Sequence, residues 1–281
     1  MKVGRGKLAI LTIDQNRCNQ DGLCVAVCPA GIIALDENKY PVLVADAEDR
    51  CLDCGQCVAV CPTGCLDHRA MAASECTLIQ KELRVTKKQC EHLFKTRRSI
   101  RNFKKKEVEQ STVSELLDLA RYSPSGHNSG GVHWLVLAKR DELDRLKEAV
   151  VSWMEYMLEQ MPEFALSLHL DSTLARWRAG EDVILRGAPM LLVAHGEKEN
   201  RMAPASCTIA LSHLELAASA RELGACWAGY FNAAANAFPP MHQLLGLPEG
   251  HVCFGAMMLG YPKFSYTRIP KRNAANIEWR L

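Results

Sequence analysis

Residues 51–62 read CLDCGQCVAVCP, and this stretch decides the organisation of the N-terminal region. Three cysteines stand two residues apart, and a fourth follows three residues later, just before a proline. This spacing is the ligand run that wraps a cuboidal [4Fe–4S] cluster, with the fourth cysteine reaching a second cluster. Zinc sites favour separated pairs of cysteines, whereas soft thiolates in this tight run suit iron and sulfide. The run therefore predicts iron–sulfur ligation by Cys51, Cys54, Cys57 and Cys61.

A related run lies upstream at residues 18–29, so the region contains an internal repeat that shares the letters CVAVCP. The spacing is kept, but Asp21 stands where the second cysteine of the run belongs. Ligands of two-cluster proteins cross over between the halves. Crossing over predicts one cluster on Cys28, Cys51, Cys54 and Cys57, and another on Cys18, Cys24, Cys61 and Asp21.

Asp21 leaves three interpretations open. Its carboxylate could ligate the fourth iron through oxygen, or that iron could be absent and leave a [3Fe–4S] cluster. Alternatively, Asp21 is a surface residue and water takes the corner. A carboxylate is a harder ligand than a thiolate, so this iron should exchange more readily than the others in each case.

Composition limits the class of protein. The chain has 281 residues, which suggests about two domains, and a net charge of +2, which gives no argument for nucleic acid or an anionic membrane as partner. Eight of the 13 cysteines precede residue 66, a crowding that favours metal ligands over disulfides. No apolar run is long enough for a membrane span, and residues 1–14 read as a first strand rather than a signal peptide. We expect a cytoplasmic protein.

Hydrophobic periodicity predicts an α+β or α/β chain, with an iron–sulfur domain at 1–70, a linker at 71–87 and a second domain at 88–281. Thr86 with Gln89, and Thr112 with Glu115, match capping boxes that begin helices. Gly224 is placed to end a helix. Further predicted elements are a hairpin within 36–50, helices at 141–160 and 204–223, and strands at 133–138, 190–194, 225–229 and 252–260.

Three polar segments could converge on an anionic ligand. RRSIRNF at 97–103 offers arginine forks and a hydroxyl, which suit phosphate, although such a basic run alone is more often a solvated face. SPSGHNS at 123–129 offers backbone donors in tight turns, and residues 268–272 add further cations. No G-x-G-x-x-G follows a strand, so no Rossmann domain is predicted.

These segments, with ACWAGYF at 225–231 and YPKFSYTRIPKR at 261–272, resemble the FMN-dependent nitroreductase family, and more closely its ferredoxin-fused branch. The resemblance covers residues 8–68 and 88–281. It implies a nitroreductase-like α+β sandwich that forms a homodimer, with an N-terminal ferredoxin-like α+β cluster domain. It also implies two FMN molecules in the dimer interface, each touched by both subunits, and a long dimer helix at 204–223.

The resemblance further implies the roles of individual residues. The phosphate and ribityl chain would be held by Arg97, Arg98, Ser99 and Arg101. The partner subunit would supply Pro124, Ser125, Gly126 and Asn128. Backbone near the isoalloxazine would come from Ala228 and Gly229. Arg268 would close over the phosphate, supported by Arg272 because Tyr266 replaces a basic residue of some relatives. A Gln-Pro pair of many relatives is here Gly130-Gly131.

The resemblance implies chemistry carried by the flavin, with no protein nucleophile and His127 as a possible proton donor. We expect electrons to pass from the clusters through FMN to a small, electron-poor acceptor such as a nitroaromatic or a quinone. The external donor would be ferredoxin, flavodoxin or NAD(P)H. Two alternatives stay open. One is a reductase or flavin-modifying enzyme for a single metabolite, its pocket built by residues 153–181. The other is an electron carrier or redox sensor without turnover.

Overall fold

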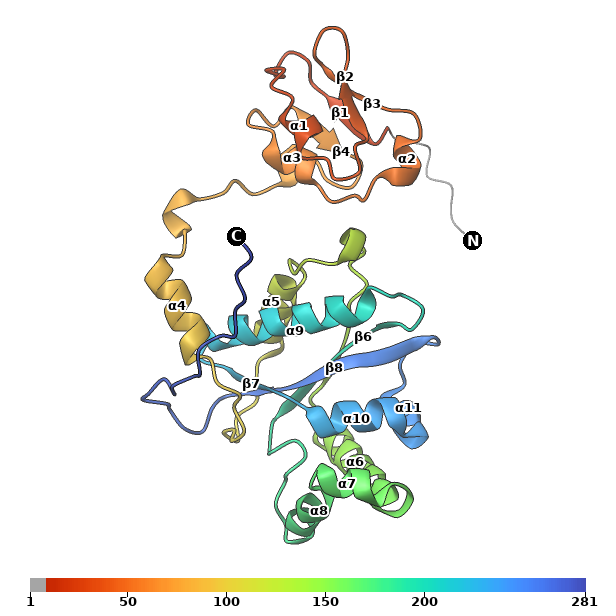
Figure 1. Cartoon of the computed structure of the whole chain (residues 1–281), viewed down its shortest axis with the longest axis vertical. Helices are drawn as coiled ribbons and strands as arrows, with labels where there is room; N and C mark the ends of the chain where they lie inside the picture. Colours follow the sequence, from red (N-terminus) through yellow and green to blue (C-terminus); the bar gives the residue numbers. More distant parts are fainter. Residues whose placement is uncertain (1–8) are drawn as a thin grey trace. The chain divides into compact units, whose positions relative to one another are not determined.

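The computed structural model describes residues 9–281, which divide into two compact units (Figure 1). The first unit extends to Arg84 and includes 127–129, and the second contains 85–126 and 130–281. Of the strand predicted within residues 1–14, the part at 1–8 lies outside the described residues, and β1 occupies Leu11–Ile13.

The first unit consists of two antiparallel strand pairs and three short helices. β1 pairs with β4, and β2 pairs with β3 in the hairpin expected within 36–50. The elements are β2 (Ile33–Leu35), β3 (Pro41–Leu43), β4 (Leu66–His68), α1 (Leu23–Ala26), α2 (Ala47–Arg50) and α3 (Gln56–Val60). A small core that includes Ile10, Ile33 and Leu66 lies among them.

The internal repeat is also a structural repeat. Gly22 and Gly55 precede α1 and α3 with φ near +70°, and Gly31 and Gly64 follow the two Cys-Pro pairs with φ of +60°. Only glycine adopts this left-handed backbone without a steric cost, so it can start and leave a one-turn helix abruptly. Each half of the repeat therefore has the same order of features along the chain, namely a glycine, a short helix, the Cys-Pro pair, a second glycine and a strand.

Two 3₁₀ turns, η1 (Ala73–Glu75) and η2 (Lys81–Leu83), precede α4 (Lys87–Thr96). The predicted capping box is confirmed, because the Gln89 N–H donates to Thr86 Oγ1 over 3.3 Å and the Thr86 N–H donates to Gln89 Oε1 over 2.9 Å. The box predicted at Thr112 is wrong. α5 (Gln110–Ala120) already begins after Glu109, since the Val113 N–H donates to the Glu109 carbonyl.

The second unit is built on an antiparallel four-stranded sheet in the order β5-β6-β8-β7. The four predicted strands are all present, as β5 (His133–Leu137), β6 (Met190–Glu197), β7 (Gly224–Trp227) and β8 (His251–Gly260). β6 is buried along almost its whole length, because both of its faces are covered. This confirms the α+β class.

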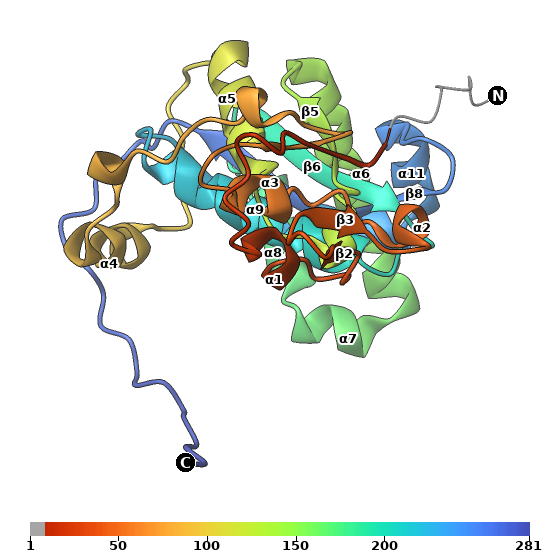
Figure 2. The ribbon, with the colours of Figure 1, turned by 90° about the horizontal axis from the view of Figure 1, so that it is seen from above.

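Helices cover both faces of the sheet. Long α9 packs on one face, and α6, α10 and α11 pack on the other (Figure 1). Between α5 and β5 the chain forms a 3₁₀ turn, η3, at Gly126–Asn128. The helices are α6 (Arg140–Gln160), α7 (Pro162–Ser167), α8 (Leu170–Arg178), α9 (Ala203–Ser219), α10 (Gly229–Ala237) and α11 (Pro239–Leu245). Figure 2 shows α6 and α11 from a second direction.

Two expectations near the end of α9 are wrong. Gly224 does not end the helix but begins β7. Glu222 takes the left-handed conformation instead, with φ of +58°, and the Leu223 N–H donates to the Ala218 carbonyl in the manner of a Schellman turn. The strand predicted at 225–229 ends at Trp227, because Gly229 opens α10.

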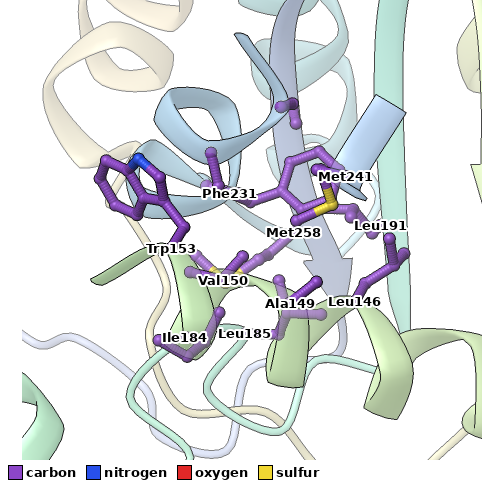
Figure 3. Packing of buried hydrophobic residues seen from close by; sticks show 14 of the residues in the cluster. Leu146, Ala149, Val150, Trp153, Ile184, Leu185, Leu191, Phe231, Met241 and Met258 are labelled. Carbon is purple, nitrogen blue, oxygen red and sulfur yellow. The ribbon is translucent and has the colours of Figure 1, made fainter. Parts of the chain in front are cut away.

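The larger core lies between the sheet and the helices α6, α10 and α11, where Trp153, Phe231 and Met241 interlock (Figure 3). On the opposite face, Leu211 of α9 packs against the sheet at Gly255. A Cβ atom at Gly255 would lie 2.5 Å from Leu211 Cδ1, so the leucine occupies the notch that this glycine leaves. No helix within 9–281 is long and apolar enough to cross a bilayer.

Replacing Leu211 by alanine should lower the free energy of unfolding by about 2–5 kcal/mol, because it removes a fully buried side chain and opens a cavity over the Gly255 notch. Urea denaturation of the purified full chain, followed by circular dichroism, measures this change. Leu244→Ala is the matched control, since Leu244 is 45% exposed and should cost under about 1 kcal/mol. Equal losses in the two variants would contradict the packing described here.

Candidate functional site

Four cysteine side chains border one cavity in the first unit. They are Cys28, Cys51, Cys54 and Cys57. Cys28 comes from the first half of the repeat and the other three come from the second half, so the structure brings together the set that crossing over assigns to one cluster. The rest of the wall is largely apolar and includes Leu11 and Ile33. Such a wall excludes water from whatever the sulfurs bind.

The thiols of this cavity are unpaired, and no disulfide forms among the described cysteines. Burial raises the pKa of Cys57 to about 11, and burial also raises the pKa of Cys51. Without a bound cation these groups hold their protons. A metal centre would displace the protons and supply the positive charge that compensates buried thiolates. The donor set therefore fits an iron–sulfur cluster.

His68 on β4 also borders the cavity, and its side chain is 1% exposed. The Ala70 N–H donates to His68 Nδ1 over 3.0 Å, so Nδ1 is the acceptor and the proton lies on Nε2. Nε2 lies 3.4 Å from Cys51 Sγ and 3.3 Å from Asp53 Oδ1. Burial lowers the pKa of His68, which favours this neutral form. His68 can thus donate a hydrogen bond to a Cys51 thiolate.

The second predicted ligand set consists of Cys18, Asp21, Cys24 and Cys61, and its members differ in their surroundings. Burial raises the pKa of Cys24, and the nearby Cys18 and Asp21 raise it further. Asp21 is engaged elsewhere as well, because its Oδ1 accepts a hydrogen bond from the Leu23 N–H over 3.1 Å at the start of α1. Cys61, the remaining member of the set, contacts Thr63 and Cys65, which follow it in the sequence.

Cys65 is a buried thiol that the sequence analysis did not assign. Its Sγ lies 3.5 Å from Cys61 Sγ, and Thr63 Oγ1 lies 3.5 Å from the same sulfur. Burial raises the pKa of Cys61, but hydrogen bonds with Thr63 and Cys65 outweigh burial and bring that pKa below its ordinary value. Cys61 is therefore the favoured thiolate, and Cys65, with its pKa raised to about 11, is the favoured donor.

In the second unit, residues 97–103 run beside β7. Ser99 forms a parallel bridge with Ala225, and the Ile100 N–H donates to the Ala225 carbonyl over 2.9 Å. The Ile100 side chain fills the space at Gly224, where a Cβ atom would lie 2.4 Å from Ile100 Cγ1. Residues 97–103 are held against β7 by these contacts, and Arg101 lines a cavity near the end of that strand.

That cavity has a volume of about 440 Å³. Its wall contains two cations, Arg101 and Arg186, and an aromatic and apolar remainder. The other lining residues are Trp153, Leu168, Val183, Ile184, Cys226, Trp227, Gly229, Tyr230, Ala233 and Met258. Neither arginine forms an ion pair with a carboxylate of the described chain. Two unpaired cations in one cavity favour an anionic ligand.

Arg186 is held in an uncommon conformation, with φ of +57°. Asp182 fixes this loop, because its carboxylate accepts hydrogen bonds from the backbone N–H groups of Ile184, Leu185 and Gly187. Lys147 Nζ lies 3.4 Å from the same carboxylate. A non-glycine residue in the left-handed region persists only where its surroundings impose it. Here those surroundings direct Arg186 to the cavity wall.

Trp153 adds an aromatic ring to the cavity wall. It is 3% exposed, and its indole N–H is the single buried side-chain donor or acceptor without a partner among residues 9–281. Figure 3 shows its ring at the border of the core, where it also lines the cavity. A buried N–H without an acceptor costs about 1–3 kcal/mol, and this N–H is closed off from solvent although the residue borders the cavity. The cavity therefore fits a flat, anionic group.

The structure gathers only part of the predicted flavin site. Arg101 and Gly229 line the cavity, and Ala228 lies next to it as the cap of α10. Arg97 instead pairs with Glu215 of α9, whose carboxylate lies 2.7 Å from Nη1. Arg98 donates to the carbonyls of Arg97 and Lys95. Glu215 was not singled out from the sequence.

The remaining predicted residues lie elsewhere. In the turn that contains Pro124 and Ser125, the Gly130 N–H donates to Ser125 Oγ, and Gly126 packs so closely on Met202 that a Cβ would overlap its sulfur. His127 and Asn128 have left-handed backbones. Arg268 and Arg272 belong to an exposed, irregular C-terminal segment, drawn as an extended trace in Figure 2. None of these residues lines the cavity.

Four cavity residues were missed from the sequence as ligand contacts: Trp153, Arg186, Trp227 and Tyr230. Trp153 occurs in an amphipathic helix, where apolar periodicity favours core or an interface, and it entered only the alternative in which residues 153–181 build a pocket. Arg186 had one signal, because it precedes Gly187 after a short apolar run and lies in a turn. Sequence spacing alone does not indicate that this turn and β7 share a cavity.

Comparison with known proteins agrees with this division. Residues 94–261 match the model of the Nitroreductase family, and residues 16–66 match the model of the 4Fe-4S dicluster domain. Two archaeal relatives carry the name "Putative NADH dehydrogenase/NAD(P)H nitroreductase". The Archaeoglobus fulgidus protein is 25% identical over 62% of this chain and 86% of its own. The Methanothermobacter thermautotrophicus protein is 27% identical over 64% and 80%.

Solved structures share the fold of the second unit. A nitroreductase with bound FMN from Bacteroides fragilis aligns with a TM-score of 0.53 and 22% identity, over 66% of this chain and 94% of that one. A BluB-like flavoprotein from Clostridium difficile aligns with a TM-score of 0.55 and 18% identity, over 67% and 99%. The family match spans the sheet, its covering helices and the cationic cavity. The chain therefore belongs to the Nitroreductase family, with a 4Fe-4S dicluster domain ahead of it.

Proposed function

We propose that this protein is an FMN-dependent oxidoreductase that passes electrons from its own iron–sulfur clusters through FMN to a small, electron-poor organic acceptor. The observation that carries the proposal is the cavity of about 440 Å³ whose wall contains the two cations Arg101 and Arg186 beside the rings of Trp153 and Trp227. Its size is within the range of cofactor sites. The bound FMN of the Bacteroides fragilis structure supports flavin as the ligand of this fold.

The flavin supplies two-electron chemistry when bound, and the clusters supply single electrons. On the protein side, Arg101 and Arg186 would offset negative charge on the cofactor, and Gly229 leaves room for close backbone approach. Trp227, which is 39% exposed, would offer an aromatic surface to a flat acceptor. The further phosphate contacts proposed from the sequence are Arg97, Arg98, Ser99, Arg268 and Arg272. His127 is kept as a proposed proton donor.

Further proposals concern the oligomeric state, the location, the domain boundaries and the electron donor and acceptor of the protein. We infer a cytoplasmic homodimer in which the partner subunit supplies Pro124, Ser125, Gly126 and Asn128 to the flavin. The domains proposed are 1–70 and 88–281, joined by 71–87. The acceptor would be nitroaromatic-like or quinone-like, and the donor would be ferredoxin, flavodoxin or NAD(P)H. The names of the archaeal relatives are consistent with NAD(P)H.

Anaerobically purified protein tests the proposal directly. We expect about one FMN and about seven or eight irons per chain, matched by acid-labile sulfide. Reduced protein should turn over menadione or a nitrobenzoate many times per flavin. The EPR spectrum of the oxidised sample distinguishes a [3Fe–4S] cluster at the Asp21 corner from a complete one. Zinc in place of iron would refute the cluster assignment, and iron without flavin, even after FMN is added, would refute the flavoenzyme.

Replacing Arg186 by alanine should weaken FMN binding by roughly tenfold to a hundredfold, because the cation has no other partner to engage. Flavin fluorescence titration of the deflavinated protein gives the dissociation constant. Arg178→Ala is the matched control, since Arg178 is exposed on α8 and pairs with Glu155. If both variants bind FMN as the wild type does, Arg186 has no part in the site.

Replacing His68 by phenylalanine should lower the reduction potential of the cluster on Cys28, Cys51, Cys54 and Cys57. A hydrogen bond to a ligand sulfur favours the reduced, more negative form. A tenfold loss of that preference corresponds to about 59 mV for one electron. EPR-monitored redox titration measures both clusters in one sample.

Cys65→Ala is the reciprocal variant. It should lower the potential of the cluster that includes Cys61 and leave the first cluster unchanged. If His68→Phe and Cys65→Ala shift both clusters alike, the change is a general effect on the domain rather than the loss of one hydrogen bond.

A further inference from the structure

Three histidines gather on one face of the sheet in the second unit. His133 and His251 are the first residues of β5 and β8, and His195 lies near the end of β6 between those strands. His133 pairs directly with His195, and His251 lies two residues from Cys253, the partner of His195 across the other strand pair. Since side chains alternate along a strand, all three project from the same face.

The three rings are in mutual contact. The ring centres of His133 and His195 lie 5.5 Å apart, those of His133 and His251 lie 4.8 Å apart, and those of His195 and His251 lie 5.1 Å apart. The Nδ1 atoms of His195 and His251 are separated by 3.0 Å. Three imidazoles bound to one tetrahedral ion at about 2.0 Å have ring centres roughly 5 Å apart, so the ring centres have the spacing of such a site. The ring nitrogens of all three do not lie within 4.8 Å of one another, so at least one ring must turn to bring them together.

The surroundings do not explain the cluster in other terms. Within residues 9–281, none of the three rings forms an ion pair with a carboxylate or a hydrogen bond with a backbone carbonyl. The one hydrogen bond that involves them joins His195 to His251. Burial, together with the two neighbouring histidines, lowers the pKa of His195 to about 4. The neutral form of imidazole is the one that binds metals.

We propose that His133, His195 and His251 form a binding site for a divalent cation of the Zn²⁺ class, with one coordination position open to solvent. Three neutral imidazoles are a known donor set for zinc and also suit Cu²⁺ and Ni²⁺. His195 and His251 already direct nitrogens at each other. His133 is exposed and stacks on His195 at 29°, so its ring can turn toward the ion without disturbing the core.

The nearby cysteine is excluded as a ligand. Cys253 is buried, burial raises its pKa to about 11, and its thiol donates to Asn232 Oδ1 over 3.4 Å. None of the three histidines lines the cavity that contains Arg101 and Arg186. The cation site is therefore separate from the proposed flavin site, and its test does not depend on flavin or on the clusters.

Zinc titration of the purified holoprotein, in competition with a chromophoric chelator, tests the proposal. His133→Ala and His251→Ala each remove one ligand without emptying the buried position, and each should weaken Zn²⁺ binding at least tenfold. His92→Ala is the matched control, because His92 is an exposed histidine of α4 and should leave the affinity unchanged. Circular dichroism verifies that the variants are folded.

X-ray absorption at the zinc edge identifies the ligands independently of the iron. We expect a first shell of nitrogen and oxygen at about 2.0–2.1 Å with the outer-shell pattern of imidazole. A first shell of sulfur at about 2.3 Å would assign the zinc to cysteines and overturn the proposal. Unchanged affinity in both His133→Ala and His251→Ala would overturn it as well.

Discussion

The hydrogen bond between the Ile100 N–H and the Ala225 carbonyl fixes the geometry on which the second unit's cavity depends. It holds residues 97–103 against β7, and this approach is possible because Gly224 has no side chain where Ile100 packs. A few residues on, Phe103 occupies the corresponding space at Gly260, where a Cβ would lie 2.9 Å from its ring. Arg101 lies between these two anchor points and lines the cavity.

Arg186 reaches the same cavity by an unrelated route. The Asp182 carboxylate satisfies three backbone N–H groups and so forces the turn that carries Arg186. Neither cation is held by an opposing charge within the described residues, and the Trp153 N–H has no acceptor. The left-handed backbone of Arg186 and the unpartnered indole N–H each cost stability. Together they indicate that the site is organised for a ligand rather than for the apo protein.

The sequence predicted those features that depend on local spacing. The 4Fe-4S dicluster domain, the four strands of the second unit and the Thr86 capping box were all predicted, because each is encoded within a few residues. The misplaced starts and ends were decided by packing rather than by local sequence. Helix α5 begins after Glu109 rather than at Thr112, because Val113 must already be helical to pack in the core. Gly224 begins β7 rather than ending α9, because the Ile100 side chain fills the space beside it.

Features that depend on tertiary contact could not be predicted in this way. Cys65 and His68 follow the second cysteine run by a few residues, but only the pairing of β1 with β4 turns His68 toward Cys51. The contact between Ala70 and His68 Nδ1 then decides which nitrogen carries the proton. No pattern of residue types specifies a tautomer.

The three histidines show the same limit more sharply. About sixty residues separate His133 from His195 and His195 from His251. In the sequence, each of these histidines lies at one end of a run of apolar residues. Strand order is what joins them. β6 lies between β5 and β8, and the irregularity after Ala194 shifts the register so that His195 opposes Cys253 and lies diagonal to His251. Without that shift, the alternation of side chains would place His195 and His251 on opposite faces of the sheet. A single bulge thus decides whether these imidazoles can share one ion.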